Sequence, residues 1–248
     1  VCHGVGVTAL TAPVQRPPCC AACVRGMRIF GKMKDLAVLQ APKRIETEAD
    51  LAAGAVVLVA RDPRFVPILA AVGPLPLRRN ADGFGALFAA IVGQQISTAA
   101  AAAIWARLEA GGLTEPAAIL SAPDDVLRKA GLSRPKIGFA RGLARADLDY
   151  AALRDLPSAA VVTQLVALPG IGRWTAEIYA SFALGHADVI AAGDLALQQA
   201  AARAFGLPTR PGERDLRRMA EDWAPVRAVA ARALWAYYRC ATNREGIW

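Results

Sequence analysis

Helical patterns follow one another from Glu46 to Cys240, and no strand pattern alternates with them. Within each segment apolar residues recur at helical spacing, and Gly or Pro marks the boundaries. Ala and Leu carry most of the apolar content, which favours helices over strands. Runs of β-branched residues, such as the one at 56–59, are few and short. With no strand–helix alternation and no fixed repeat, the sequence predicts an all-α fold.

The predicted helices differ in length. A long one is expected from about Phe84 to Leu108, because its apolar pattern runs on until the Gly111–Gly112 pair. Later helices are expected over Ile171–Leu184, over 194–205 and over 225–240. Residues 1–32 have no helical pattern and are expected to be a disordered leader, which leaves 33–248 as the helical domain.

Composition and charge narrow the class of protein. The 248 residues are 55% hydrophobic and carry a formal net charge of +8, so the chain is globular and basic. A basic surface attracts polyanions, which favours nucleic acid as a partner. The most apolar window, around Phe84 to Trp105, is interrupted by Gln94 and Gln95, so no membrane span is expected.

The cysteines indicate a reducing compartment. Cys19, Cys20 and Cys23 lie in the leader, and Cys240 alone lies in the expected folded body. This distribution is not a disulfide framework, which fits a cytoplasmic protein. The CCAAC segment has the residues for a metal site, but no second pair of ligands follows at a suitable spacing.

The stretch LPGIGRWTAEIYA, at 168–180, has two glycines that flank one apolar residue between two helical patterns. This spacing suits a tight turn, with Leu168 and Ile171 packed inward. The first N–H groups of the following helix lack partners within the helix and lie at the positive end of its dipole, so the turn can hold a phosphate. A plain connection between two helices is the alternative on spacing alone.

Several segments together with this turn resemble the helix-hairpin-helix DNA glycosylase superfamily. They are AIVGQQISTAAA, GLSRPKIGFARGLA, DVIAAGDLALQQ and WAPVRAVAARALW, in that order and around the LPGIGRW motif. The branch they resemble is the alkylpurine one, of the 3-methyladenine DNA glycosylase II type. The resemblance implies two helical lobes with an active cleft between them. Lobe A would span about 60–150 with flanking segments, and lobe B about 151–240 with the hairpin at 168–180.

The resemblance also assigns the chemistry. It makes Asp194 the catalytic carboxylate, and the position after Gly193 is also typical of a helix N-cap. An ionised carboxylate stabilises the positive charge that develops on the sugar as the base leaves. In relatives that also cut the strand, a lysine forms a Schiff base at the position that Trp174 occupies here. No lysine occurs after Lys136, so hydrolysis by water is expected, and not lyase chemistry.

Three residues are expected to form the pocket for the flipped base. Trp174 and Trp235 would stack on it, with a cation–π contribution for positively charged bases. Ile178 stands where the family has a tyrosine, so one stacking surface is absent. Each tryptophan could instead be part of the core.

The resemblance places the DNA contacts at the hairpin and at the GQQIS turn. Gly170, Ile171 and Gly172 would hold a phosphate, with Arg173 and Lys136 as further phosphate contacts. Gln95 would be the wedge that fills the space of the flipped nucleotide.

Gln95 also has a structural alternative, in which the two glutamines of GQQIS tie two helices together. Of the other acids, Glu177 is expected to face solvent and Asp188 to shape the loop before Asp194. His186 is expected to be structural.

Some relatives have four C-terminal cysteines that hold an iron–sulfur cluster. Only Cys240 occurs in that region here, so no cluster is expected. Other relatives bind a monovalent cation through hairpin carbonyls, which would be those of Val166, Leu168 and Ile171. No other cofactor is expected.

The protein is thus interpreted as a monomeric, nucleoid-associated monofunctional glycosylase that removes alkylated purines, chiefly 3-methyladenine, from duplex DNA. The alternatives are a non-catalytic DNA-binding module and a bifunctional glycosylase/lyase for oxidised bases.

Overall fold

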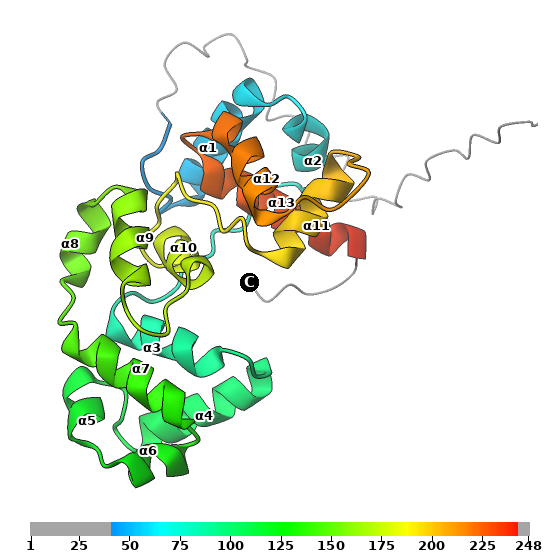
Figure 1. The fold of residues 1–248 in the computed structure, drawn as a ribbon. Helices are drawn as coiled ribbons and strands as arrows, with labels where there is room; N and C mark the ends of the chain where they lie inside the picture. The colour runs from blue at the N-terminus through cyan, green and yellow to red at the C-terminus, as the bar shows by residue number, and fades with distance from the viewer. Residues whose placement is uncertain (1–40, 243–248) are drawn as a thin grey trace, which may run out of the picture.

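The computed structural model describes residues 41–242, and within this range the fold is built of thirteen α-helices and one short 3-10 helix (Figure 1). The predicted all-α class is confirmed. The one β-type contact in this range is an isolated bridge between Arg44 and His186. The predicted leader at 1–32 lies outside the described residues.

The helices are short and end at capping residues or Gly and Pro positions. In order they are α1 (Glu48–Arg61), α2 (Phe65–Val72), α3 (Phe84–Gly93), α4 (Thr98–Ala110), α5 (Pro116–Ser121), α6 (Asp124–Ala130), α7 (Arg134–Arg145), α8 (Tyr150–Asp155), α9 (Ser158–Val166), α10 (Arg173–Phe182), α11 (Leu195–Ala204), α12 (Glu213–Met219), η3 (Ala220–Trp223) and α13 (Arg227–Thr242).

The predicted helix from Phe84 to Leu108 is broken into α3 and α4, so that prediction was wrong. Ser97 caps the second helix by accepting a hydrogen bond from Ala100 N–H at 3.2 Å. Gln95 has a φ of 61°, which a continuous helix does not allow. Apolar residues recur in the sequence on both sides of the break, so the apolar pattern alone does not mark it. The break sets the GQQIS turn out from the helices.

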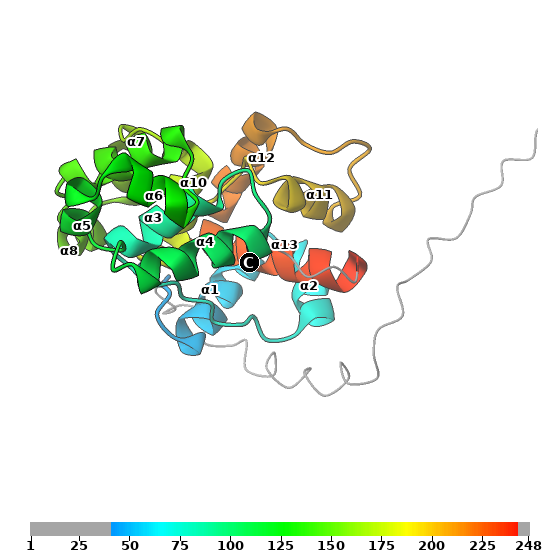
Figure 2. The ribbon, with the colours of Figure 1, turned by 90° about the horizontal axis from the view of Figure 1, so that it is seen from below.

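The helices fall into two groups by their contacts with one another. α13 packs against α1, α2 and α11, so the two ends of the described chain form one group together with α12 (Figure 1). The other group contains α3 to α7, and the α9–α10 pair contacts it through α3 (Figure 2). Helix contacts therefore place α2 with the C-terminal helices and the hairpin beside α3. The lobe boundaries at about 60–150 and 151–240 stay a prediction.

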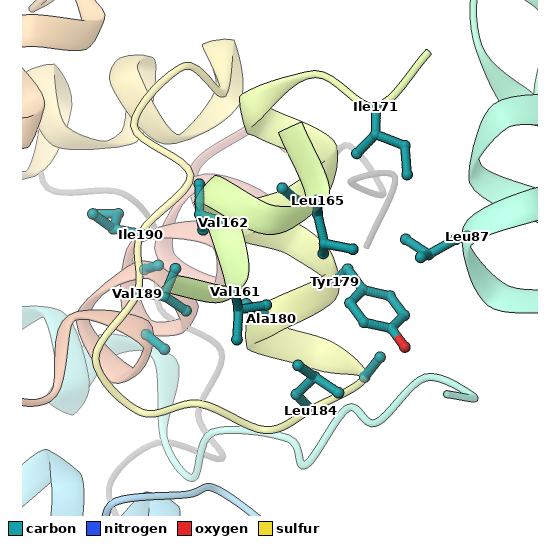
Figure 3. Close-up of a cluster of buried hydrophobic side chains, with 14 of the residues drawn as sticks. Leu87, Val161, Val162, Leu165, Ile171, Tyr179, Ala180, Leu184, Val189 and Ile190 are labelled. Carbon is teal, nitrogen blue, oxygen red and sulfur yellow. The ribbon is translucent and has the colours of Figure 1, made fainter. Parts of the chain in front are cut away.

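The hairpin helices α9 and α10 both bury apolar side chains in one core (Figure 3). Val161 and Leu165 of α9 are fully buried, as is Ala180 of α10. Ile171, between the two helices, is 4% exposed, which confirms that it packs inward. Leu168 is partly buried against the same core. Apolar burial therefore fixes the turn that carries the glycines.

A polar contact links α10 to the start of α3. The Tyr179 hydroxyl donates to the Asp82 carboxylate and accepts a hydrogen bond from Gly83 N–H at 3.1 Å. Arg154 pairs with the other oxygen of Asp82 at 2.5 Å. Burial and the Asp82 carboxylate raise the pKa of Tyr179, so the phenol remains a neutral donor.

Candidate active site and DNA-binding surface

Asp194 lies at the N-terminus of α11, as the N-cap interpretation predicted. Its Oδ1 accepts a hydrogen bond from Leu197 N–H at 2.8 Å, and the positive end of the α11 dipole faces the carboxylate. Two indoles add further donors: Trp174 Nε1 donates to Oδ2 at 3.1 Å and Trp235 Nε1 donates to Oδ1 at 3.2 Å. These three donors hold the carboxylate in one orientation, half-buried beside two aromatic rings.

The two tryptophans thus have a role in holding Asp194 that was not predicted, and the base stacking predicted for them stays a prediction. Both are half-buried and pack against a small apolar cluster of Ile178, Phe182 and Ala191, separate from the main core. The ring of Trp235 is tilted by 40° against Phe182, with centroids 5.7 Å apart. The structure thus brings the predicted residues Asp194, Trp174, Trp235 and Ile178 together at one site.

The hairpin geometry explains why glycine stands at its first position. Gly170 has a φ of 85°, and a Cβ there would lie 2.4 Å from the Phe139 ring. Gly172 has an extended φ of −80° and open space around its Cα, and it is the N-cap of α10. An N-cap glycine offers no side chain to the first N–H groups of α10, so no capping side chain of Gly172 competes with an anion there.

The GQQIS turn is fastened to the hairpin by the first of its two glutamines. Gln94 Nε2 donates to the carbonyl of Gly170 at 2.7 Å, so this glutamine has the tying role that was the alternative for both glutamines. Gln95 is exposed and has a left-handed backbone conformation. One glutamine thus fixes the turn, and its neighbour is presented to solvent.

Lys136 supports the same turn from α7. Its Nζ donates to the carbonyls of Val92 and Gln94 at 2.7 and 2.8 Å. These are terminal carbonyls of α3, which otherwise lack partners. Burial lowers the pKa of Lys136. The phosphate contact predicted for Lys136 stays a prediction, whereas its structural role was not foreseen.

Ionic contacts surround the hairpin helix. Glu177 is 2% exposed, so the expectation that it faces solvent was wrong. Its carboxylate pairs with Arg173 at 3.0 Å and with Arg217 at 2.8 Å, and Arg217 also pairs with Glu213. These pairs tie α10 to α12. The side chain of Arg173 is still 57% exposed and can reach a phosphate.

The loop before Asp194 has its own support. Asp188 lies 3.5 Å from Arg227 at the start of α13, in line with its expected role in shaping the loop. His186 is 5% exposed, and its Nδ1 lies 3.0 Å from Ser158 Oγ, which agrees with a structural role. Burial is the main cause that lowers the pKa of His186.

Metal ligands do not gather anywhere in residues 41–242: no group of three or more His, Cys, Asp or Glu side chains is placed to hold an ion. Of the hairpin carbonyls predicted to bind a monovalent cation, that of Leu168 accepts a hydrogen bond from Ile171 N–H at 3.2 Å. Across the same range, no helix is both long and apolar enough to span a membrane.

An all-helical fold, a glycine hairpin and an aspartate at the next helix N-terminus together define a class of DNA repair protein. The chain belongs to the HhH-GPD superfamily of base excision DNA repair proteins, whose family model matches residues 88–225. It is 33% identical to a DNA-3-methyladenine glycosidase from Bacillus halodurans. The crystal structure of that protein matches with a TM-score of 0.70 over 77% of this chain and 90% of the other.

Two further comparisons point to the same branch. A 3-methyladenine DNA glycosylase of Schizosaccharomyces pombe, solved in complex with abasic DNA, matches with a TM-score of 0.62. It is 26% identical over 73% of this chain and 94% of that one. By sequence, DNA-3-methyladenine glycosylase 1 of the same yeast is 27% identical over 193 residues, which is 74% of this chain and 85% of the relative.

Proposed function

We propose that the protein is a monofunctional DNA glycosylase that hydrolyses the N-glycosidic bond of alkylated purines, chiefly 3-methyladenine, in duplex DNA. The observation that carries the proposal is the Asp194 carboxylate, held by two indole N–H groups and a helix N-terminus beside an aromatic cluster. The relatives named above act on 3-methyladenine, which supports the choice of base.

Asp194 supplies the charge that the reaction needs. As the bond between base and sugar breaks, the sugar becomes positively charged, and an ionised carboxylate nearby lowers the energy of that state. The same carboxylate can orient the attacking water. Alkylated purines that already carry a positive charge leave readily, so the site needs no strong general acid.

The residues argue against strand cleavage through a covalent intermediate. Lyase chemistry requires an amine that attacks the sugar, and Trp174 occupies the position where the bifunctional relatives have lysine. The lysine that lies closest before it in the sequence is Lys136, and its Nζ is engaged by two carbonyls of the α3 terminus and GQQIS turn. Water is therefore the nucleophile in the proposed reaction, and the product is an abasic site in an intact strand.

The duplex is proposed to lie across the hairpin and the GQQIS turn. The N–H groups at the start of α10, with Arg173 beside them, would hold one backbone phosphate. Gln95, exposed and held out by the anchored turn, would enter the base stack and face the unpaired base. Trp174 and Trp235 would stack on the flipped base.

We expect a monomer that works on chromosomal DNA in the cytoplasm. No redox or metal cofactor takes part in the proposed hydrolysis. A monovalent cation at the carbonyls of Val166, Leu168 and Ile171 would steady the hairpin.

Base release from methylated DNA tests the function. Purified protein is incubated with DNA treated with a methylating agent, and the free bases are separated by chromatography. We expect 3-methyladenine in the soluble fraction and no covalent protein–DNA adduct after borohydride treatment. Binding without base release would show a non-catalytic module, and a trapped adduct would show the bifunctional chemistry.

A further inference from the structure

A small pocket beside Trp235 is lined largely by arginines. Its walls are Pro76 and Arg78 from the segment before α3, Phe182 from α10, and Arg232, Trp235 and Arg239 from α13. The three α13 residues are three and four positions apart, so they share one face of the helix. The cavity measures about 20 Å³, which is room for about one or two non-hydrogen atoms and too little for a purine ring.

The positive charges in this pocket have no acidic partner. Across residues 41–242, Arg78, Arg232 and Arg239 form no ion pair with a carboxylate. Burial, and next the positive charge of Arg239, lowers the pKa of Arg78. Burial and the charge of Arg79 lower the pKa of Arg232 to about 10. Like charges held together without a counter-charge cost free energy, and a bound anion would offset that cost.

Arg232 is the most buried arginine of the pocket. It is 6% exposed and stacks on Phe182, with the guanidinium carbon 4.4 Å from the ring centroid. Its two terminal nitrogens donate to Ser181 Oγ and to the carbonyls of Ser181 and Ala228, all at 3.0–3.1 Å, which fixes the guanidinium group. The Nε atoms of Arg232 and Arg239 are buried, and neither has a hydrogen-bond partner in the described part of the chain. Buried N–H donors without an acceptor are rare, and a ligand with oxygen acceptors would satisfy them.

A phosphate group has the chemistry that this pocket requires. Guanidinium and phosphate form charge-assisted hydrogen bonds, often two in parallel. One or two phosphate oxygens can enter a cavity of this size, while the rest of the group stays at its mouth. Phosphates also lie close to this place in any productive complex, because Trp235 lines the pocket and donates to Asp194. A sugar that reaches Asp194 carries a phosphate on each side.

We propose that Arg78, Arg232 and Arg239 form an oxyanion site that binds a phosphate group, either a backbone phosphate beside the flipped nucleotide or free inorganic phosphate. The site deepens the proposed function, and one consequence rests on that function. A positively charged base stacked on Trp235 is repelled by the three arginines, and a bound phosphate offsets this repulsion.

The melting temperature tests the site without DNA. Wild-type protein is compared in sodium phosphate and in sodium chloride of equal ionic strength, alongside Arg78→Met, Arg239→Met and the double variant. Arg61→Met is the control, because Arg61 is an exposed arginine at the end of α1 and its loss removes the same charge. We expect phosphate to stabilise the wild type and the control by several degrees more than chloride does. This difference should shrink in each single variant and shrink further in the double variant. Phosphate held at the hairpin acts on all these proteins alike, so the comparison isolates the pocket.

A salt series with DNA distinguishes the two sources of phosphate. Affinity for a duplex with a stable abasic-site analogue is measured by fluorescence anisotropy at increasing salt. If the pocket holds a backbone phosphate, each single variant loses one phosphate contact, and the slope of log affinity against log salt falls by about 0.9. If the pocket holds free phosphate, the variants lose the stabilisation by phosphate and keep the slope of the control.

Pocket variants that match Arg61→Met in both measurements would overturn the inference. Circular dichroism verifies folding, and if Arg239→Met does not fold, Arg78→Met, on a segment outside the helices, carries both measurements. Neither measurement depends on base release, so the two proposals fail separately. Loss of phosphate stabilisation in the variants of a protein that releases no 3-methyladenine would refute the proposed function and keep the oxyanion site. Release of 3-methyladenine, with pocket variants that match the control, would do the reverse.

Discussion

Replacing Asp194 with asparagine removes the negative charge and little else. The amide oxygen of asparagine can still accept the hydrogen bond from Leu197 N–H, and asparagine is as good an N-cap as aspartate. The amide nitrogen replaces one acceptor, so one of the two indoles, Trp174 or Trp235, loses its partner. We expect this to cost about 1 kcal/mol of folding free energy, which is a small decrease in melting temperature.

The effect on the reaction follows from electrostatics. A unit charge about 4 Å from the developing positive charge on the sugar contributes about 4 kcal/mol at the effective dielectric of a partly buried protein site. Since each ~1.4 kcal/mol changes the rate tenfold, Asp194→Asn should slow base release roughly a thousandfold. Binding of abasic DNA should weaken far less, because the phosphate contacts are untouched.

Single-turnover release of 3-methyladenine from methylated DNA, with protein in excess over lesions, measures the chemical step directly. Asp194→Ala is the companion variant, which loses the N-cap as well as the charge. Similar rates for the two variants, with asparagine more stable to heat, would support the electrostatic role. Release by Asp194→Asn within tenfold of wild type, with the fold intact, would refute the assignment of this carboxylate to catalysis.

Three further predictions concern the structural supports of the site. Gln94→Ala should weaken binding to abasic DNA several-fold by freeing the GQQIS turn from the Gly170 carbonyl, as measured by fluorescence anisotropy; an unaltered affinity would show that the turn is rigid without it. Lys136→Met should lower stability by about 1–3 kcal/mol, because two buried carbonyls lose their donor; a change only in the salt dependence of DNA binding would instead indicate a phosphate contact. His186→Gln should flatten the pH dependence of the melting temperature. Burial lowers the pKa of the ring in the folded state, so the unfolded chain binds the proton more readily, and the wild-type protein loses stability as the pH falls through about 6.5. Parallel pH profiles for the two proteins would contradict this explanation.

Local patterns in the sequence were sufficient for the fold class and for the hairpin. Helical periodicity and the Gly170–Gly172 spacing act over a few residues, so the sequence displays them directly. The break between α3 and α4 was missed, although Ser97 followed by a helical run is a recognisable N-cap pattern. An apolar pattern that continues across a break hides it, and only the cap residue marks the boundary.

Contacts between distant segments could not be predicted in the same way. Nothing near Trp174 or Trp235 in the sequence indicates that both indoles donate to Asp194, which lies far from each along the chain. The burial of Glu177 is similar, because its partner Arg217 comes from another helix.

The hydrogen bond from Gln94 to Gly170 has a mechanical consequence. It joins the loop that would grip the backbone to the turn that would probe the base stack, so the two cannot shift independently. Any sideways movement of the grip along the strand would carry the probing residue, Gln95, with it. Such an enzyme would probe each base step of the duplex at a fixed distance from the phosphate that it holds. A damaged base would then be detected because its stacking on the neighbouring bases is weaker at that distance from the phosphate.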